Sequence, residues 1–493
     1  MVNLSTISML RRVFVGCIWL LMLMGLVACG RKTTEEQFMP IVEKALNDTS
    51  SVYYVNPDDF SHDLSSFSIG IFDDGLWGFN VLEAFLTADH FDNITGVAKA
   101  DGIADFAGEQ FVYLADGANA SYGQYLQYGN LEFLKETVVR DALFLLDNSY
   151  YNLVIDERPY GVKSRSKLLV CANAAASTYG FQEVETLLDR LHTDVMALSV
   201  ADAAATSFLD WTTQQSDVAV GVLASPQVIE AGYYEKAIRR SKDARAYLGK
   251  VAVCNQATPH LESMMGPVAG VSDSTSLPQL GFGEGMIDIT LLDRYGFDFA
   301  NGAMIYSLKN GFYSELTINS PENLARFYLV SLVEKYRKQG NEQPLQAVIL
   351  ACPYMTALRP ILEETLASLR EYKRNGIYLY EDVIAKDFVF IDPAQEVVRS
   401  AYQALRESHL LALRVIPTEV EVYLSMPTYG TDATVLTANG MFKEAYRYGR
   451  AAGSVVVTTK PVPMAYRYLS LSDLEQMQWI APTAYKLIVN RLY

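Results

Sequence analysis

The chain has 493 residues and carries 57 acidic against 40 basic side chains, a formal net charge of −17 at pH 7. A protein this acidic has no electrostatic reason to bind nucleic acid or anionic lipid. Half of the residues are hydrophobic (50%), which is enough for large cores, and the length predicts two or three domains.

The N-terminus has the pattern of a bacterial export signal. Arg11 and Arg12 precede an uncharged apolar run, Val13 to Ala28, whose length suits a signal peptide better than a bilayer span. The run ends in the letters LVACG, a lipobox pattern around Cys29. We therefore expect removal of residues 1–28 and lipidation of Cys29, with diacylglycerol on the thiol and a second acyl chain, such as palmitate, on the new amino terminus. The alternative is an uncleaved N-terminal anchor.

This signal predicts a protein of the bacterial cell envelope, anchored by lipid to a membrane on its periplasmic or surface side. The expected membrane contact is through the lipid on Cys29. Residues 29–65 form a polar leader, which we interpret as a tether between the lipid and the folded body.

After the leader, apolar strand-like runs alternate with helical stretches. Segments that open with a strand are 66–72, 109–118, 166–175, 216–225, 343–353 and 387–392. All but the second run directly into amphipathic helical sequence, and a further capped helix is predicted from Ser320 to Tyr336. Repeated strand, loop and helix predict an α/β fold with parallel sheets, in which ligands bind at the carboxyl ends of the strands.

Three cysteines lie beyond the signal region, Cys171, Cys254 and Cys352, each in or beside an apolar run. The number is odd, and the spacing matches neither a disulfide framework nor a metal site. They are either buried thiols or include a thiol that acts as an acid or base.

Six segments carry a family resemblance when they are taken together and in order. They are IGIFDDGLWG from Ile69, FVYLADGANASYG from Phe111, LVCANAAAS from Leu169, GVLASPQVIEAGYYEKAI from Gly221, QATPHLESMM from Gln256 and VILACPYMTALRPILEE from Val348. This series resembles the motifs of the aspartate/glutamate racemase superfamily, and of glutamate racemase in particular, over about residues 66–450. A last segment, FIDPAQEVVRSAYQAL, resembles the closing strand and helix of that family.

The resemblance implies two doubly wound α/β lobes around a central cleft. Lobe one would comprise residues 66–215 and 376–450, and lobe two residues 216–375 with an insertion at 268–320, followed by a C-terminal extension at 451–493. The resemblance also implies two thiols, one per lobe, which remove and return the α-proton of an amino acid, each with a partner that takes its proton.

The chain departs from the family pattern at the first thiol. Ala172 occupies that position, and Cys171, one residue earlier in a strand, is expected on the opposite face and in the core. Cys352 retains the second thiol, but Tyr354 stands where the family has a histidine, and a tyrosine with a pKa of about 10 is a poor base. Asp73 matches the acidic partner of the missing thiol.

The candidate catalytic residues are therefore Cys352 and Asp73. Asp74 replaces a family serine and adds negative charge where the carboxylate of an acidic substrate would lie. The substrate-binding residues implied by the resemblance are Asp74, Ser121, Tyr122, Gly123, Asn173, Ala174 and Ser225. No metal or organic cofactor is expected, since the sequence has no metal-ligand cluster, dinucleotide fingerprint or phosphate loop.

Three functional hypotheses follow. The protein has lost two-thiol catalysis and binds a partner or a small ligand, such as an amino acid or carboxylate. Or it is a single-thiol enzyme using Cys352, similar to arylmalonate decarboxylase, which has a small residue at the first thiol position. Or it is an amino-acid racemase with Asp73 or Asp74 as a substitute base. Export favours the first two, because D-glutamate for cell-wall precursors is made in the cytoplasm.

Overall fold

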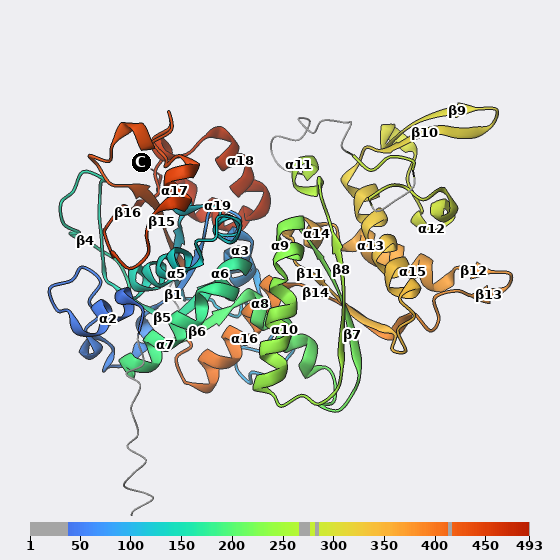
Figure 1. Ribbon diagram of the computed structural model, residues 1–493. Helices are drawn as coiled ribbons and strands as arrows, with labels where there is room; N and C mark the ends of the chain where they lie inside the picture. Colours follow the sequence, from blue (N-terminus) through green and yellow to red (C-terminus); the bar gives the residue numbers. More distant parts are fainter. Residues whose placement is uncertain (1–37, 266–276, 282–284, 413–416, 493) are drawn as a thin grey trace, which may run out of the picture. The chain divides into compact units, whose positions relative to one another are not determined.

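The computed structural model describes residues 38–265, 277–281, 285–412 and 417–492 (Figure 1). The predicted signal peptide and Cys29 lie outside these residues, as does part of the predicted insertion. Both large sheets belong to the unit formed by Pro40–Tyr493. No helix in the described part of the chain combines the length and the apolarity that a bilayer span requires.

The first sheet has six strands in the order β16-β15-β2-β1-β5-β6. They are β1 (Ser68–Asp73), β2 (Gln110–Ala115), β5 (Ser166–Cys171), β6 (Met196–Ser199), β15 (Glu419–Pro427) and β16 (Thr459–Pro463). All neighbours are parallel except β16, which is antiparallel to β15. Strands β1 and β5 are buried along their whole length, as expected for parallel strands covered on both faces.

The second sheet has four parallel strands in the order β14-β11-β7-β8. They are β7 (Val218–Ala224), β8 (Val251–Ala257), β11 (Leu345–Leu350) and β14 (Ile384–Ile391). The predicted α/β class is confirmed, with a second sheet that is fully parallel and a first sheet that is parallel except for β16.

Helices follow most strands, as the sequence pattern predicts. Those after the strands of the first sheet are α3 (Phe79–Thr87), α5 (Leu131–Leu146), α6 (Ala174–Tyr179), α7 (Phe181–Leu191) and α8 (Val200–Asp210). Those of the second are α9 (Pro226–Ala231), α10 (Tyr233–Ala244), α13 (Pro321–Lys338), α14 (Pro353–Ala357), α15 (Arg359–Glu371) and α16 (Pro393–Glu407). Helix α13 starts where predicted, with the Ser320 hydroxyl accepting a hydrogen bond from the Asn323 N–H at 3.1 Å.

The predicted boundary of lobe one at residue 376 needs correction. Strand β14 lies in the range assigned to lobe one, but it pairs in parallel with β11 and completes the second sheet. The physical reason is that a parallel strand joined by one crossover helix, here α15, usually lies beside its predecessor. The return to the first sheet comes with α16, which packs against α3 and α8.

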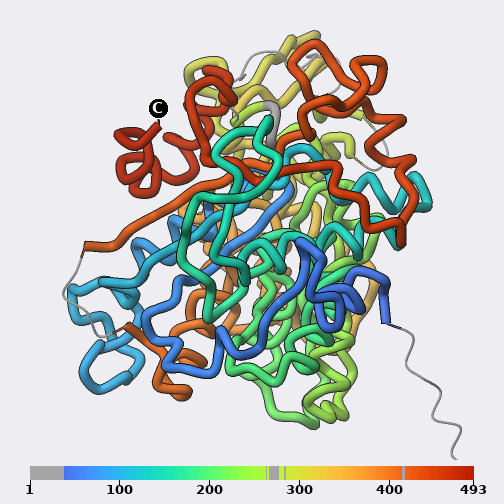
Figure 2. The backbone as a smooth tube through the Cα atoms, turned by 90° about the vertical axis from the view of Figure 1, so that its left-hand side faces the viewer, coloured from blue at the N-terminus to red at the C-terminus, as the bar shows by residue number. Residues whose placement is uncertain are grey.

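Two segments outside the predicted lobes, the leader and the C-terminal extension, are integral to the fold. In the leader, α2 (Pro40–Asn47) packs on α5 and α7 and fully buries Ile41 and Ala45, and η1 (Pro57–Phe60) and η2 (Leu64–Ser66) follow it. The C-terminal extension contributes β16 together with α18 (Leu471–Ile480) and α19 (Pro482–Val489), which contact α3. Figure 2 shows the orange β15 beside segments drawn in blue and cyan; its hydrogen-bonded neighbours in the sheet are β2 and β16.

The described part of the predicted insertion forms η4 (Ile289–Leu291), α12 (Leu292–Tyr295) and a hairpin of β9 (Met304–Lys309) and β10 (Phe312–Ile318). The remaining short elements are η3 (Gly117–Asn119), α4 (Gln124–Gln127), β3 (Ser149–Tyr150), β4 (Gly161–Val162), α11 (Leu261–Met265), η5 (Ala300–Gly302), β12 (Lys373–Arg374), β13 (Ile377–Tyr378), η6 (Ala433–Val435), α17 (Glu444–Gly449) and η7 (Tyr466–Tyr468).

Candidate functional site

A cavity of about 260 Å³ lies at the carboxyl ends of strands from both sheets. The first sheet contributes Asp73 at the end of β1, Asp74 directly after it, and Ala172 after β5. The second contributes Cys352 after β11 and Asp392 after β14. This is the place where parallel sheets gather ligand-binding residues, because successive loops meet at one edge.

The two adjacent aspartates form a coupled carboxyl pair. Asp73 is buried, and it accepts hydrogen bonds from the Gly78 N–H at 2.8 Å and from the Asn173 side-chain amide at 3.0 Å. Asp74 accepts one from the Tyr122 N–H at 2.7 Å. Burial, and next the charge of Asp74, raises the pKa of Asp73 to about 8, and burial also raises the pKa of Asp74. The pair therefore retains a proton near neutral pH.

The first thiol position is occupied by a methyl group. Ala172 lines the cavity, whereas Cys171 is fully buried, and its thiol donates to the Asn173 carbonyl with a sulfur–oxygen distance of 3.4 Å. The predicted strand register, with Cys171 in the core, is confirmed. Burial raises the pKa of Cys171 to about 12. This thiol neither lines the cavity nor ionises at neutral pH.

The two cysteines should therefore differ in reactivity with a thiol reagent. Cys352 is half-buried and lines the cavity, so N-ethylmaleimide should modify it in the native protein while Cys171 stays unmodified. Peptide mass spectrometry measures both, and unfolding in guanidinium is the control in which both should react. Native labelling of Cys171 at the rate of Cys352 would contradict this strand register.

Tyr354, at the position of the family histidine, belongs to an aromatic cluster. Its ring lies edge-on to Trp77 with centroids 5.0 Å apart, and it stacks on Trp479 at 5.2 Å. Trp77 comes from the loop after β1 and Trp479 from α18 of the C-terminal extension. Tyr354 is itself buried, and its ring provides packing between the two sheets and the C-terminal extension.

The small cavity adjoins a larger cleft of about 1080 Å³, and Asp74, Ser121, Asn173 and Ser225 line both. The C-terminal extension supplies part of the larger wall, with Arg467, Tyr468, Leu469, Ser470, Asp473 and Gln476. Most polar side chains on this wall are uncharged hydroxyls and amides. Within the described residues, Arg467 is the one positively charged side chain that lines the small cavity or the larger cleft.

Most of the predicted site residues come together in this region. The small cavity is lined by Asp73, Asp74, Ser121, Asn173, Ala174, Ser225 and Cys352, and Gly123 lines the larger cleft. Tyr122 requires a correction: its ring is fully buried, and its hydroxyl donates to Asp116 at 2.7 Å and to Asp141. The buried carboxyls of Asp116 and Asp141 hold the Tyr122 hydroxyl away from the cleft, so only its backbone N–H serves the site, through Asp74.

Sequence reasoning missed Trp77, Asp392 and Arg467. Asp392 caps α16 by accepting the Ala394 N–H at 3.0 Å, and burial raises its pKa to about 6. It directly follows a predicted strand, so the rule that ligand residues follow parallel strands could have found it. No comparable signal marks Arg467, which lies in η7 after β16, a strand that the sequence pattern did not predict.

No family model matches this chain, and no curated protein matches it. Among solved structures, it is similar to glutamate racemase from Bacillus anthracis (16% identity, TM-score 0.39, covering 74% of this chain and 89% of that one). It is also similar to glutamate racemase from Francisella tularensis in complex with D-glutamate (18%, TM-score 0.38, 73% and 89%). A third is an aspartate racemase homologue from Pyrococcus horikoshii (12%, TM-score 0.30, 70% and 99%).

Proposed function

We propose that this chain is an envelope lipoprotein with a racemase-like fold, whose cleft binds a small uncharged polar ligand and does not interconvert the enantiomers of glutamate or aspartate. The observation that carries this proposal is Ala172, a methyl group in the same cavity as Cys352 and at the position of the family's first thiol. Inversion by proton transfer needs an acid–base group on each face of the α-carbon, and alanine supplies none.

The charges of the site support an uncharged ligand. Asp73, Asp74 and Asp392 line the small cavity, and no lysine, arginine or histidine lines it in the described part of the chain. A dicarboxylic amino acid would bring further negative charge to these carboxyls, which costs free energy in a partly desolvated site. Hydroxyl and amide side chains, with the faces of Trp77 and Tyr468, suit a ligand that forms neutral hydrogen bonds and packs against rings.

The predicted absence of racemase activity is tested in heavy water. The protein is incubated with L-glutamate, D-glutamate, L-aspartate and D-aspartate, and the α-proton and the enantiomer ratio are followed by NMR and chiral chromatography. We expect neither interconversion nor α-proton exchange above a protein-free control. Interconversion that disappears in Cys352→Ser would refute the proposal.

Ligand binding is tested by thermal shift in the same preparation. Neutral polar compounds, such as N-acetyl amino-acid amides and small sugars, should raise the melting temperature, whereas glutamate and aspartate should not. Asp74→Asn provides the matched comparison, because it removes a charge and keeps the shape; it should improve binding of the acidic compounds. A glutamate shift in the wild type equal to that of the neutral compounds would contradict this account.

A second candidate is an acid–base enzyme, and one observation favours it. Asp73, with a pKa of about 8, and Cys352 line the same cavity from different sheets, so each side of a bound ligand would face a group able to transfer a proton. Neutral amino acids and malonate-type acids extend the heavy-water experiment to this case. Exchange or decarboxylation without inversion, lost in Cys352→Ser, supports a single-thiol enzyme. Inversion lost in both Cys352→Ser and Asp73→Asn supports a racemase with an aspartate base.

The anchor is tested separately. Cys29→Ser removes the proposed lipidation site, so the protein should move from the membrane fraction to the soluble fraction, because no thiol remains to carry diacylglycerol. Fractionation and immunoblotting measure the distribution, with Cys171→Ser as the control that should stay with membranes. Membrane retention of the Cys29→Ser protein, after confirmed expression, counts against the lipoprotein.

A further inference from the structure

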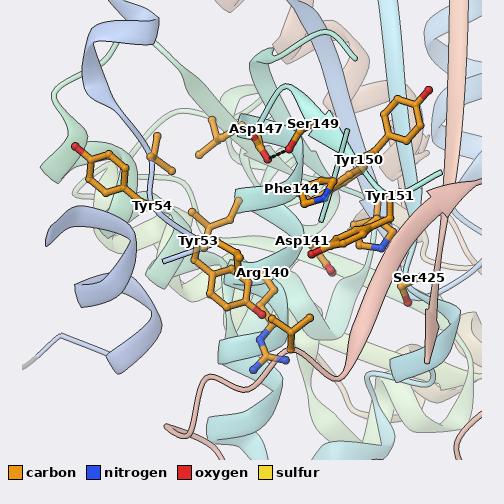
Figure 3. A pocket seen from close by; sticks show the side chains of 18 of the residues that line it. Tyr53, Tyr54, Arg140, Asp141, Phe144, Asp147, Ser149, Tyr150, Tyr151 and Ser425 are labelled. Carbon is orange, nitrogen blue, oxygen red and sulfur yellow. Dashed lines mark hydrogen bonds between the residues drawn. The ribbon is translucent and has the colours of Figure 1, made fainter. Parts of the chain in front are cut away.

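A separate cavity of about 290 Å³ lies against the first sheet (Figure 3), and Cys352 is not among the residues that line it. Its walls come from the leader, from α5, from the segment after α5 and from the strands of the C-terminal region. Among the residues that line it, Ser425 alone also lines the larger cleft, and none lines the small cavity. This cavity is therefore separate from the candidate site in the cleft, and the leader forms part of its wall.

Asp141 of α5 is the key group in this cavity. Its side chain is only 5% exposed, and it lines the cavity. The Tyr122 hydroxyl donates to its Oδ2, and Asp141 makes no other hydrogen bond and no ion pair within the described part of the chain. Burial, and next the charge of Asp116, raises its pKa well above the ordinary range. A buried carboxylate without a counter-charge is costly, so the empty cavity favours the protonated form.

The arginines of the cavity are already engaged. Arg140 pairs with Glu136, and Arg165 pairs with Asp59. Asp116, which also lines the cavity, accepts hydrogen bonds from the neutral side chains of Asn119, Tyr122 and Ser425. The cavity therefore contains two buried carboxyl groups, Asp116 and Asp141, and the two arginines that line it are paired with other acids. A positively charged ligand in this cavity would form a new ion pair with one of these carboxyl groups.

Aromatic rings form much of the remaining wall: Tyr53, Tyr54, Phe60, Phe144, Tyr150 and Tyr151. Two of these rings already attract cations of the protein, since Lys163 lies 4.6 Å from the Phe144 centroid and Lys460 lies 4.9 Å from that of Tyr151. Aromatic faces around a buried carboxylate are the chemistry that recognises organic ammonium ions. A volume of about 290 Å³ suits one small molecule.

We propose that this cavity is a second ligand site, specific for a small organic amine whose ammonium group binds Asp141 and whose apolar part packs among the tyrosines. The site is independent of the neutral ligand proposed for the cleft, and the two proposals can fail separately.

The experiment compares benzylamine with benzyl alcohol, which has nearly the same shape and no charge. Calorimetric titrations use the full chain in detergent, with Cys352 first alkylated by N-ethylmaleimide so that the small cavity beside it is obstructed. Benzylamine should bind at least about tenfold more tightly than benzyl alcohol. Asp141→Asn should remove that preference, whereas Asp243→Asn, at an exposed position of α10, should retain it.

Several results would overturn the proposal. They are equal binding of the two compounds, no binding of benzylamine, loss of its binding on alkylation of Cys352, or an unchanged preference in Asp141→Asn. Should Asp141→Asn fail to fold, the wild-type comparison of the two compounds still decides. A second measurement on the wild type is proton release: benzylamine should displace the proton of Asp141, so the binding enthalpy should depend on the ionisation enthalpy of the buffer.

Discussion

Replacing Lys167 by methionine should lower the free energy of unfolding by about 3–5 kcal/mol. Lys167 lies on β5 and is fully buried. Its Nζ donates to the two carboxylate oxygens of Glu109 at 3.0 and 2.8 Å and to the Ser65 carbonyl at 2.9 Å. Methionine keeps the apolar stem but removes the ammonium group that pairs with the buried carboxylate of Glu109, itself 1% exposed. Urea unfolding followed by circular dichroism measures the loss.

Two comparisons show whether the loss comes from the buried charge. Lys309→Met, at an exposed position of the β9–β10 hairpin, should change stability by no more than about 0.5 kcal/mol. Adding Glu109→Gln to Lys167→Met removes the carboxylate that pairs with Lys167 in the wild type and should restore part of the stability, a coupling that a double-mutant cycle quantifies. A Lys167→Met protein as stable as the wild type would mean that Glu109 is not ionised in the folded state.

Replacing Gly78 by alanine should destabilise the protein by about 1–3 kcal/mol and weaken ligand binding in the cleft. A Cβ at this position would lie 2.7 Å from the Cβ of Asp73 and 2.6 Å from the Tyr113 hydroxyl oxygen. Asp73 cannot give way easily, because it is buried and accepts the Gly78 N–H. The loop must move, which disturbs the carboxyl pair at the centre of the site. Thermal unfolding and the thermal-shift panel measure the two effects.

Gly75 provides the matched control within the same loop. A Cβ there would meet no atom within 4 Å, so Gly75→Ala should leave stability and ligand binding close to wild type. If both alanine variants behaved alike, the close approach of the Gly78 loop to Asp73 would not matter to the site.

The order of the elements and much of the site could be predicted because local patterns encode them. Apolar runs such as Ser68–Asp73 specify buried parallel strands, and the residue after such a strand falls at the ligand edge of the sheet. Strand alternation separated Cys171 from Ala172, and the structure has one in the core and the other in the cavity wall. Each of these inferences needs only the neighbouring residues.

What the sequence by itself determined, then, is the α/β class and the capped start of α13, while the gathering of Asp73, Asn173 and Cys352 at one site was implied by the family resemblance of its motifs. Only the tertiary structure decided that β14 completes the second sheet, that the Tyr122 ring turns into the core, and that α18 brings Trp479 onto Tyr354. These contacts join segments far apart in the chain, and they depend on which surfaces find complementary shape and charge after the strands have paired. The local sequence pattern of a segment does not specify which distant segment it will contact.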